Sequence, residues 1–251
     1  MSDSSSDRDT DTARRRFLGT VAGAVAALTV APGVLLVRTA RAKTDAEPVS
    51  AAVRWGMLID TDKCAKGCDA CVSACDKEHG LYKTGPAEDQ AQWIRKVEVK
   101  NPRTGYAFSL PMMCQHCENP PCVDVCPTGA SFRRADGIVL VDRHICIGCR
   151  YCMMACPYKA RSFVAENLHH QVAESPRGKG TVGGCNMCVH RVDENESPAC
   201  VEACDADGHK AIVFGDMKDP DSDISRQLAS YRTRQIRADL GLDPGVYYRG
   251  I

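Results

Sequence analysis

The cysteines constrain this chain more than any other feature of its sequence. All sixteen fall into four groups of four, and none is left over. The third group reads CIGCRYCMMACP, which is a C-x2-C-x2-C-x3-C-P run. The groups are Cys64, Cys68, Cys71 and Cys75; Cys114, Cys117, Cys122 and Cys126; Cys146, Cys149, Cys152 and Cys156; and Cys185, Cys188, Cys200 and Cys204.

The C-x2-C-x2-C-x3-C-P run is typical of [4Fe–4S] clusters, and its fourth cysteine binds a different cluster from the first three. Three closely spaced thiolates can reach three irons of one cube, so the fourth iron needs a ligand from another segment. The fourth cysteine follows at the end of an expected short helical turn, which Pro127 and Pro157 terminate in the second and third groups. We therefore predict four [4Fe–4S] clusters that form together with the fold.

The four groups differ in how strongly they indicate iron–sulfur chemistry. The second, CQHCENPPCVDVCP, has a wider central gap, the first lacks the proline, and the fourth has eleven residues between Cys188 and Cys200. A disulfide framework, paired zinc knuckles and a [3Fe–4S] cluster in place of one cube are the alternatives. Neither disulfide nor zinc sites need a repeated C-x2-C-x2-C-x3-C spacing, so the pattern favours four cubes.

Residues 1–42 read as a twin-arginine signal peptide. RRRFL at residues 14–18 opens an apolar run that extends to residue 37, and ARA at residues 40–42 is an A-x-A cleavage site. An uncleaved membrane anchor is the alternative, because the run is long enough to span a bilayer. Export of an already folded protein would protect the thiols from an oxidising compartment. We therefore expect a periplasmic protein that reaches the inner membrane through partners.

The rest of the chain predicts an α+β fold of tandem bacterial-ferredoxin-like units with a pseudo-two-fold repeat. MLID at residues 57–60 and VLVD at residues 139–142 each precede a cysteine group by the same distance. We expect residues 43–215 to form a four-cluster ferredoxin-like domain of short antiparallel hairpins and small helices around the clusters. Residues 216–251 are expected to be a C-terminal extension that wraps the surface or contacts a partner.

Individual elements can also be predicted. We expect hairpins that pair residues 131–134 with 138–141 and residues 97–100 with 106–110. A further strand is expected at residues 211–214, and one helix at residues 225–240.

Other polar and sulfur-containing side chains have weaker signals. His116 and His190 lie beside cluster cysteines, and we expect hydrogen-bond donors to the clusters or surface groups. Met153, Met154 and Met187 are expected to pack against the cubes. The chain has 32 Lys+Arg and 32 Asp+Glu, which gives no indication of a nucleic-acid partner. No nucleophile or acid–base pair stands out, so we expect a protein that is not an enzyme by itself.

Longer motifs give the chain a family resemblance. The Cys-Pro endings, CENPPC, and CNMCVHRVD closing on SPACVEAC resemble the four-cluster ferredoxin subunits of membrane-bound oxidoreductases, the NrfC, PsrB and DmsB type, over residues 55–216. The twin-arginine signal, the wide first gap of CAKGC and a C-terminus without an apolar helix are most similar to the DsrO subunits of DsrMKJOP complexes in dissimilatory sulfur metabolism.

The resemblance implies which cysteines share a cube. Groups one and four would share two cubes, and groups two and three the other two. The implied sets are Cys64, Cys68, Cys71 and Cys204; Cys185, Cys188, Cys200 and Cys75; Cys114, Cys117, Cys122 and Cys156; and Cys146, Cys149, Cys152 and Cys126.

The resemblance also implies a function and partners. The chain would relay electrons between an NrfD-type integral membrane subunit that interacts with quinone (DsrP-like) and a cytochrome c subunit (DsrJ-like). A subunit of a different respiratory reductase, linked to nitrite, polysulfide or hydrogenase, is the alternative, as is a stand-alone periplasmic ferredoxin.

Overall fold

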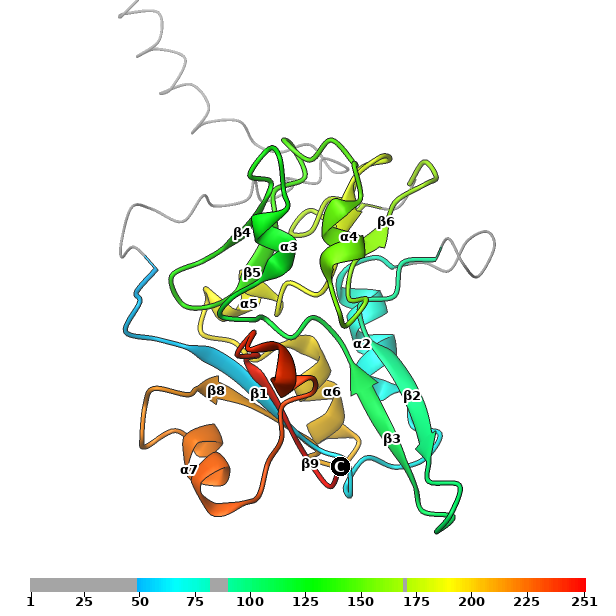
Figure 1. Cartoon of the computed structure of the whole chain (residues 1–251), viewed down its shortest axis with the longest axis vertical. Coiled ribbons are helices and arrows are strands. Elements are labelled where there is room, and N and C mark those ends of the chain that lie inside the picture. Colours follow the sequence, from blue (N-terminus) through cyan, green and yellow to red (C-terminus); the bar gives the residue numbers. More distant parts are fainter. Residues whose placement is uncertain (1–48, 82–89, 169–170) are drawn as a thin grey trace, which may run out of the picture. The chain divides into compact units, whose positions relative to one another are not determined.

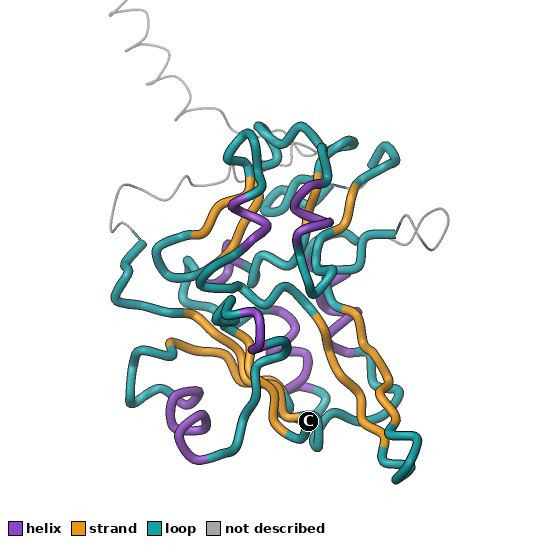
Figure 2. Tube along the Cα trace, in the orientation of Figure 1, coloured by secondary structure: helices purple, strands orange, loops and turns teal. Residues whose placement is uncertain are grey.

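The protein is described by a computed structural model that covers residues 49–81, 90–168 and 171–251. The predicted signal peptide at residues 1–42 lies outside the described residues. Within the described part of the chain, no helix has the length and apolarity needed to cross a bilayer. Helices, strands and long loops alternate along the chain (Figures 1 and 2).

A three-stranded sheet joins segments that are far apart in the sequence. Its central strand, β1 (Trp55–Asp60), pairs antiparallel with β8 (Ile212–Asp216) and parallel with β9 (Val246–Arg249). Figure 1 shows β1 between the strands from the C-terminal part of the chain. The residues of β1 from Gly56 onward are all buried, because the strand has neighbours on both edges and is covered by packed elements.

Three two-stranded hairpins complete the strands, and two of them were predicted. The expected pairing of residues 131–134 with 138–141 is confirmed, since Ser131 lies opposite Val141. The expected pairing of residues 97–100 with 106–110 is also confirmed, with both strands longer than predicted. The hairpins are β2 (Arg95–Lys100) with β3 (Ala107–Met112), β4 (Ser131–Arg133) with β5 (Val139–Val141), and β6 (Ser162–Phe163) with β7 (Val182–Gly183).

The turn between β4 and β5 requires its glycine. Gly137 has a φ of 91°, which favours glycine, and a Cβ here would collide with the Arg54 guanidinium. That guanidinium donates hydrogen bonds to the carbonyl oxygens of Gly137, at 3.0 Å, and His116, at 2.8 Å. Arg54 thereby fastens the β4–β5 hairpin to the segment that leads into β1.

The helices are short, and most begin or end at a cysteine motif. Helix α2 packs against α6, and α3 packs against α4. Proline stands at the start of α3 and just before α6, where the first backbone N–H groups need no helical partner. The helices are α2 (Ala70–Glu78), α3 (Pro121–Asp124), α4 (Tyr151–Ala155), α5 (Val189–Val192), α6 (Ala199–Ala206) and α7 (Asp223–Ser230).

The prediction of one helix over residues 225–240 is wrong. Helix α7 starts earlier, where the Ser222 side chain accepts a hydrogen bond from the Ser225 backbone N–H, and it ends at Ser230. The chain then pairs Arg234 with Tyr248 of β9 through two backbone hydrogen bonds of 2.8 Å. A short 3-10 turn, η3 (Ala238–Leu240), follows. Pairing with a distant strand therefore prevails over local helix propensity.

The C-terminal extension does more than wrap the surface. Val246 and Tyr248 of β9 are fully buried. The Tyr248 hydroxyl donates a hydrogen bond to the Pro111 carbonyl oxygen at 3.1 Å and accepts one from Gln115 Nε2 at 3.1 Å. The last residues of the chain thus close the core beside β1 and connect it to the segment that contains the second cysteine group.

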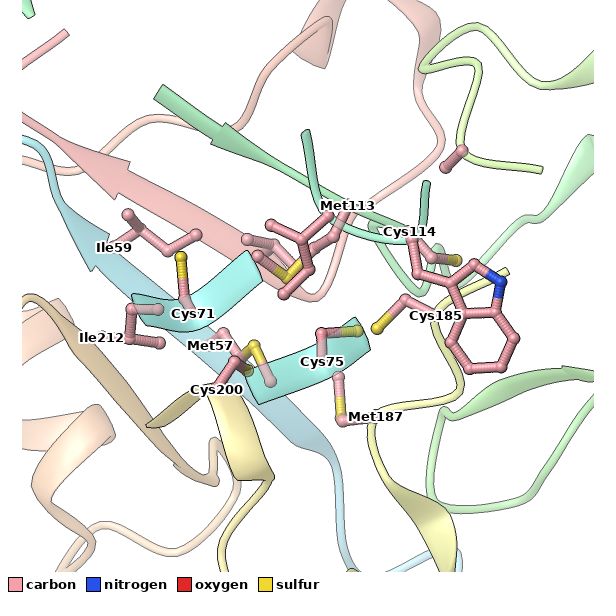
Figure 3. Close-up of a cluster of buried hydrophobic side chains, with 14 of the residues drawn as sticks. Met57, Ile59, Cys71, Cys75, Met113, Cys114, Cys185, Met187, Cys200 and Ile212 are labelled. Carbon is pink, nitrogen blue, oxygen red and sulfur yellow. The ribbon is translucent and has the colours of Figure 1, made fainter. Parts of the chain in front are cut away.

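The core consists to a large extent of cysteine. Eleven of the sixteen cysteines are buried, and several pack with Met57, Ile59 and Trp93 in one cluster. Figure 3 shows this packing around Cys71, Cys75 and Cys200. A core with so few large apolar side chains depends on whatever fills the space between its sulfur atoms.

Removing the Tyr248 hydroxyl tests the contribution of β9. We expect Tyr248→Phe to lower the free energy of unfolding by about 1–3 kcal/mol, because Pro111 and Gln115 lose their partner in a buried place. Anaerobic thermal or denaturant unfolding followed by circular dichroism measures the change. Tyr247→Phe is the control, since the half-buried Tyr247 hydroxyl makes no hydrogen bond within the described residues. Equal effects of the two substitutions would contradict this role of Tyr248.

Candidate metal centres

Two of the C-x3-C pairs each span one helical turn. Cys71 and Cys75 lie on α2, and Cys200 and Cys204 lie on α6. Residues four apart lie on one face of a helix, displaced along its axis. Because α2 packs against α6, cysteines of the two helices can approach one another at two positions along the helix axes, one helical turn apart. In the packed pair α3 and α4, Cys122 and Cys152 lie on the helices, and Cys126 and Cys156 follow just beyond the helix ends.

Three cavities are each lined by four cysteines, three from one sequence group and one from another. We call them site I (Cys64, Cys68, Cys71 and Cys204), site III (Cys114, Cys117, Cys122 and Cys156) and site IV (Cys126, Cys146, Cys149 and Cys152).

The remaining four cysteines also lie close together. Burial, together with the nearby Cys185, Cys200 and Cys188, raises the pKa of the Cys75 thiol well above its usual value. In Figure 3 the sulfur atoms of Cys75 and Cys185 point toward one another, whereas Cys71 on the same helix points elsewhere. We call this group site II (Cys75, Cys185, Cys188 and Cys200).

The donor set and the space fit [4Fe–4S] clusters. Each site has four sulfur atoms, one for each iron of a cube. All sixteen cysteines are free thiols, so the disulfide framework is excluded. A single zinc ion with sulfur ligands at about 2.3 Å would leave no large cavity between them. Pockets that open between four sulfur atoms, as at sites I, III and IV, instead suit a larger inorganic group.

Without metal, several of the buried cysteines would be neutral thiols rather than thiolates. Burial raises the pKa of Cys71 to about 11, and that of Cys117 to about 12, with further contributions from the neighbouring cysteines. Four thiolates in so small a space repel one another unless a cation is present, and a coordinated thiol is deprotonated outright. The sites are therefore built to be completed by metal.

Backbone N–H groups reach the fourth cysteine of three groups. The N–H of Ala211 lies 3.2 Å from Cys204 Sγ, that of Ser131 lies 3.3 Å from Cys126 Sγ, and that of Ala160 lies 3.5 Å from Cys156 Sγ. In each case the chain turns back after the short helix and directs a donor at the sulfur. Such hydrogen bonds hold the ligand in place and stabilise negative charge on it.

A buried cation contacts site III, and no sequence motif indicates it. Arg161 Nη2 lies 3.4 Å from Cys122 Sγ and 3.1 Å from Ser131 Oγ. Burial alone would lower the pKa of Arg161, but Cys122 and Cys114 raise it above its ordinary value. The guanidinium therefore stays charged next to site III, and its partner Ser131 is also the residue whose N–H reaches site IV.

A buried histidine contacts site II. His79 Nε2 lies 3.4 Å from Cys188 Sγ. Burial lowers the pKa of His79 to about 3, so the ring is neutral and its Nε2–H can donate to the sulfur. The sequence interpretation missed His79, although its position four residues after Cys75 at the end of α2 indicates the same helix face.

The two histidines singled out from the sequence have other partners. His116 is fully buried, and its Nδ1 accepts the Val139 backbone N–H at 3.0 Å. His190 Nε2 lies 2.7 Å from a Glu78 carboxylate oxygen. Partial burial pushes the pKa of Glu78 upward, but the hydrogen bond from His190 and the charge of Arg191 give a net lowering. Neither histidine forms a hydrogen bond to cysteine sulfur within the described residues.

The methionines divide into two kinds. Met187 is buried in the core among the cysteines, and the half-buried Met153 packs against a smaller cluster of buried residues that includes Cys122 and Cys152. Met154 is 67% exposed, so the expectation that it packs against a cube is wrong. Its place on the outer face of α4 directs it to solvent, one residue after the inward-facing Met153.

Comparisons with known proteins agree with these sites. Residues 106–216 and residues 63–130 each match a 4Fe-4S dicluster domain family. The Hdr-like menaquinol oxidoreductase iron-sulfur subunit 1 of Archaeoglobus fulgidus is 42% identical, over 94% of this chain and 97% of that protein. A tetrathionate reductase subunit of Salmonella typhimurium is 37% identical, over 96% and 89%. NrfC of Escherichia coli is 37% identical, over 93% of each.

The chain therefore belongs to the family of 4Fe-4S dicluster iron–sulfur subunits of oxidoreductases. Two dicluster domains and sixteen cysteines mean that it carries four [4Fe–4S] clusters, as predicted. The small mixed fold of short hairpins and helices agrees with the expected ferredoxin-like class.

Neutralising Arg161 tests its electrostatic role. We expect Arg161→Met to lower the reduction potential of the cluster at site III by on the order of 60 mV, a tenfold change in a one-electron equilibrium. The cause is loss of a buried cation that stabilises the more negative reduced state. Arg161→Lys should shift it less. An EPR-monitored redox titration measures both.

Arg95→Met is the matched control, because Arg95 is half-buried and donates to the Tyr158 carbonyl oxygen at 2.8 Å rather than to sulfur. An Arg161→Met protein with all four clusters and an unchanged potential at site III would refute the electrostatic role.

Proposed function

We propose that this chain is the electron-transfer subunit of a membrane-bound oxidoreductase complex and relays electrons along a row of four clusters. The supporting observation is the continuity of the row. Sites I and II share the helices α2 and α6, and sites III and IV share α3 and α4. The two halves meet at Cys185 of site II, whose pKa is raised by burial and by the nearby Cys114 of site III.

The ligands of each cluster in this proposal are the four cysteines of one site. Sites I and II would exchange Cys75 and Cys204, and sites III and IV would exchange Cys126 and Cys156. Support comes from the three cavities lined by these sets and from the closeness of Cys75 to Cys185, Cys188 and Cys200. The exchange also suits a pseudo-two-fold relation between the halves, which stays a prediction.

The chain itself would supply ligands, insulation and charge rather than a reaction centre. The clusters supply the one-electron chemistry. The buried cysteines, the N–H donors and Arg161 would set the potentials and keep water away from sites II and III. This division of work agrees with the expectation that the chain is not an enzyme by itself.

The proposed place is the periplasmic side of the inner membrane, after export of the folded protein by the twin-arginine pathway. The RRRFL motif and the A-x-A site support export. An NrfD-type membrane subunit would exchange electrons with quinone, which the name of the menaquinol oxidoreductase relative supports. The twin-arginine signal and the wide first gap of CAKGC favour a DsrMKJOP-type complex of sulfur metabolism, with DsrP-like and DsrJ-like partners.

A subunit of a different respiratory reductase is the second candidate. The tetrathionate reductase subunit and NrfC among the relatives favour it, since both are similar to this chain over almost its whole length. Gentle detergent purification of the tagged protein from its native membranes, followed by identification of the subunits that co-purify, separates the two. A protein that elutes without partners would instead support the stand-alone ferredoxin.

Metal analysis tests the proposal at its base. Protein purified anaerobically should contain about sixteen irons and as many acid-labile sulfides, four of each per cluster. Its reduced form should show several interacting EPR signals, because the four clusters are close together. Stoichiometric zinc without iron or sulfide would refute the electron-transfer function.

The crossed ligation has its own test. We expect Cys156→Ser to damage the cluster at site III and to spare site IV, although Cys156 belongs to the sequence group that lines site IV. Cys126→Ser is the reciprocal control and should damage site IV and spare site III. Site-resolved EPR or Mössbauer spectra of the anaerobic proteins distinguish the two. Loss of the site IV signal in Cys156→Ser, with site III intact, would contradict the exchange.

A further inference from the structure

An apolar surface surrounds site IV. Four large side chains around this site are exposed: Ile145, Ile147, Tyr151 and Met154, at 48%, 66%, 53% and 67%. We call them the outer patch. Ile147 lines the cavity of site IV, and Tyr151 and Met154 lie three residues apart on the outer face of α4. Figure 1 shows α4 beside α3, away from the three-stranded sheet. Exposed apolar patches of this kind mark interaction surfaces.

The metal centre under the outer patch is the one that reaches the surface. Cys149 of site IV is the single exposed cysteine of the sixteen, all of which lie in the described residues. A cluster that transfers electrons to another protein must come close to that protein. An exposed cluster ligand surrounded by apolar side chains is therefore a suitable point for electrons to enter or leave. The patch also offers apolar area to bury, at roughly 25 cal/mol per Å².

The segment that contains the outer patch carries charges of one sign. Residues 143–160 contain no Asp or Glu, and Arg150 and Lys159 are exposed. Arg150 lines the cavity of site IV, and its guanidinium is held 3.9 Å above the Phe163 ring. Around site I, by contrast, exposed charges of both signs occur, such as Lys66 and Asp207. The segment that presents the outer patch is therefore basic.

We propose that the outer patch docks a redox protein whose contact surface has an apolar centre and an acidic rim, and that electrons pass through site IV. This inference rests on the proposed electron-transfer function. One electron passes at a time, so the partner's redox group is reduced when site IV is oxidised, or the reverse. A second copy of this chain would place Arg150 against Arg150. A lipid surface could match the charge but accepts no electron.

The test uses the complex purified from native membranes with a tag on this chain. Met154→Glu places an acid in the outer patch at an exposed position, so the fold and clusters should survive. We expect normal iron content and potentials, and loss of one redox subunit that the wild-type protein retains. We also expect a fall of about tenfold or more in the rate of electron transfer between the clusters and that subunit, followed as reduction of the clusters by menadiol or as reoxidation of dithionite-reduced clusters by the subunit. Val97→Glu, at another exposed apolar residue, is the matched control and should change neither.

The outcomes separate this inference from the function on which it rests. Wild-type protein without iron would end the electron-transfer proposal itself. Wild-type protein with four clusters, together with a Met154→Glu protein that keeps all subunits and the full rate, would overturn the docking proposal alone.

Light scattering that shows a dimer in wild type and a monomer in Met154→Glu would assign the patch to a second copy. Binding to phosphatidylglycerol vesicles that Met154→Glu abolishes, with the redox subunit retained, would assign it to lipid.

Discussion

The fold depends on a single helical turn between two cysteines that belong to different metal sites. In the C-x3-C pairs of α2 and α6, one turn displaces the second sulfur by about 6 Å along the helix axis. When two such helices pack together, each gives one sulfur to each of two neighbouring sites. The spacing of the clusters is then set by helix geometry, and neither helix can move without disturbing both sites.

This exchange explains how a chain with short elements can form a stable core. The helices and hairpins are too short to be stable alone, and the core contains more buried cysteines than aromatic side chains. Burial raises the pKa of several of these thiols, such as those of Cys71 and Cys117. Without metal, the core would therefore contain protonated thiols, or thiolates that repel one another, around unfilled space. Metal binding energy therefore becomes folding energy. The strands β1, β8 and β9 then join the ends of the described chain across this centre.

The sequence predicts what local spacing determines. Cysteine spacing identified the clusters, and alternating residues around tight turns identified the β2–β3 and β4–β5 hairpins. It did not predict β9 or the end of α7, because both depend on pairing with residues far away in the chain. Arg161 was missed for the same reason, since no motif relates it to Cys122. His79 could have been found from its position one turn after Cys75.

Arg161 shows how the row tolerates so much negative charge. Each cluster with four thiolates is anionic, and two neighbouring anions in a buried place repel one another strongly. Besides contacting Cys122, Arg161 has its charge close enough to Cys114, Cys152 and Cys185 to lower their pKa values against the effect of burial. These cysteines belong to three sites, so one fixed cation stands where sites II, III and IV come together. An electron added there is stabilised before any counter-ion or proton arrives from solvent, which suits a relay in the protein interior.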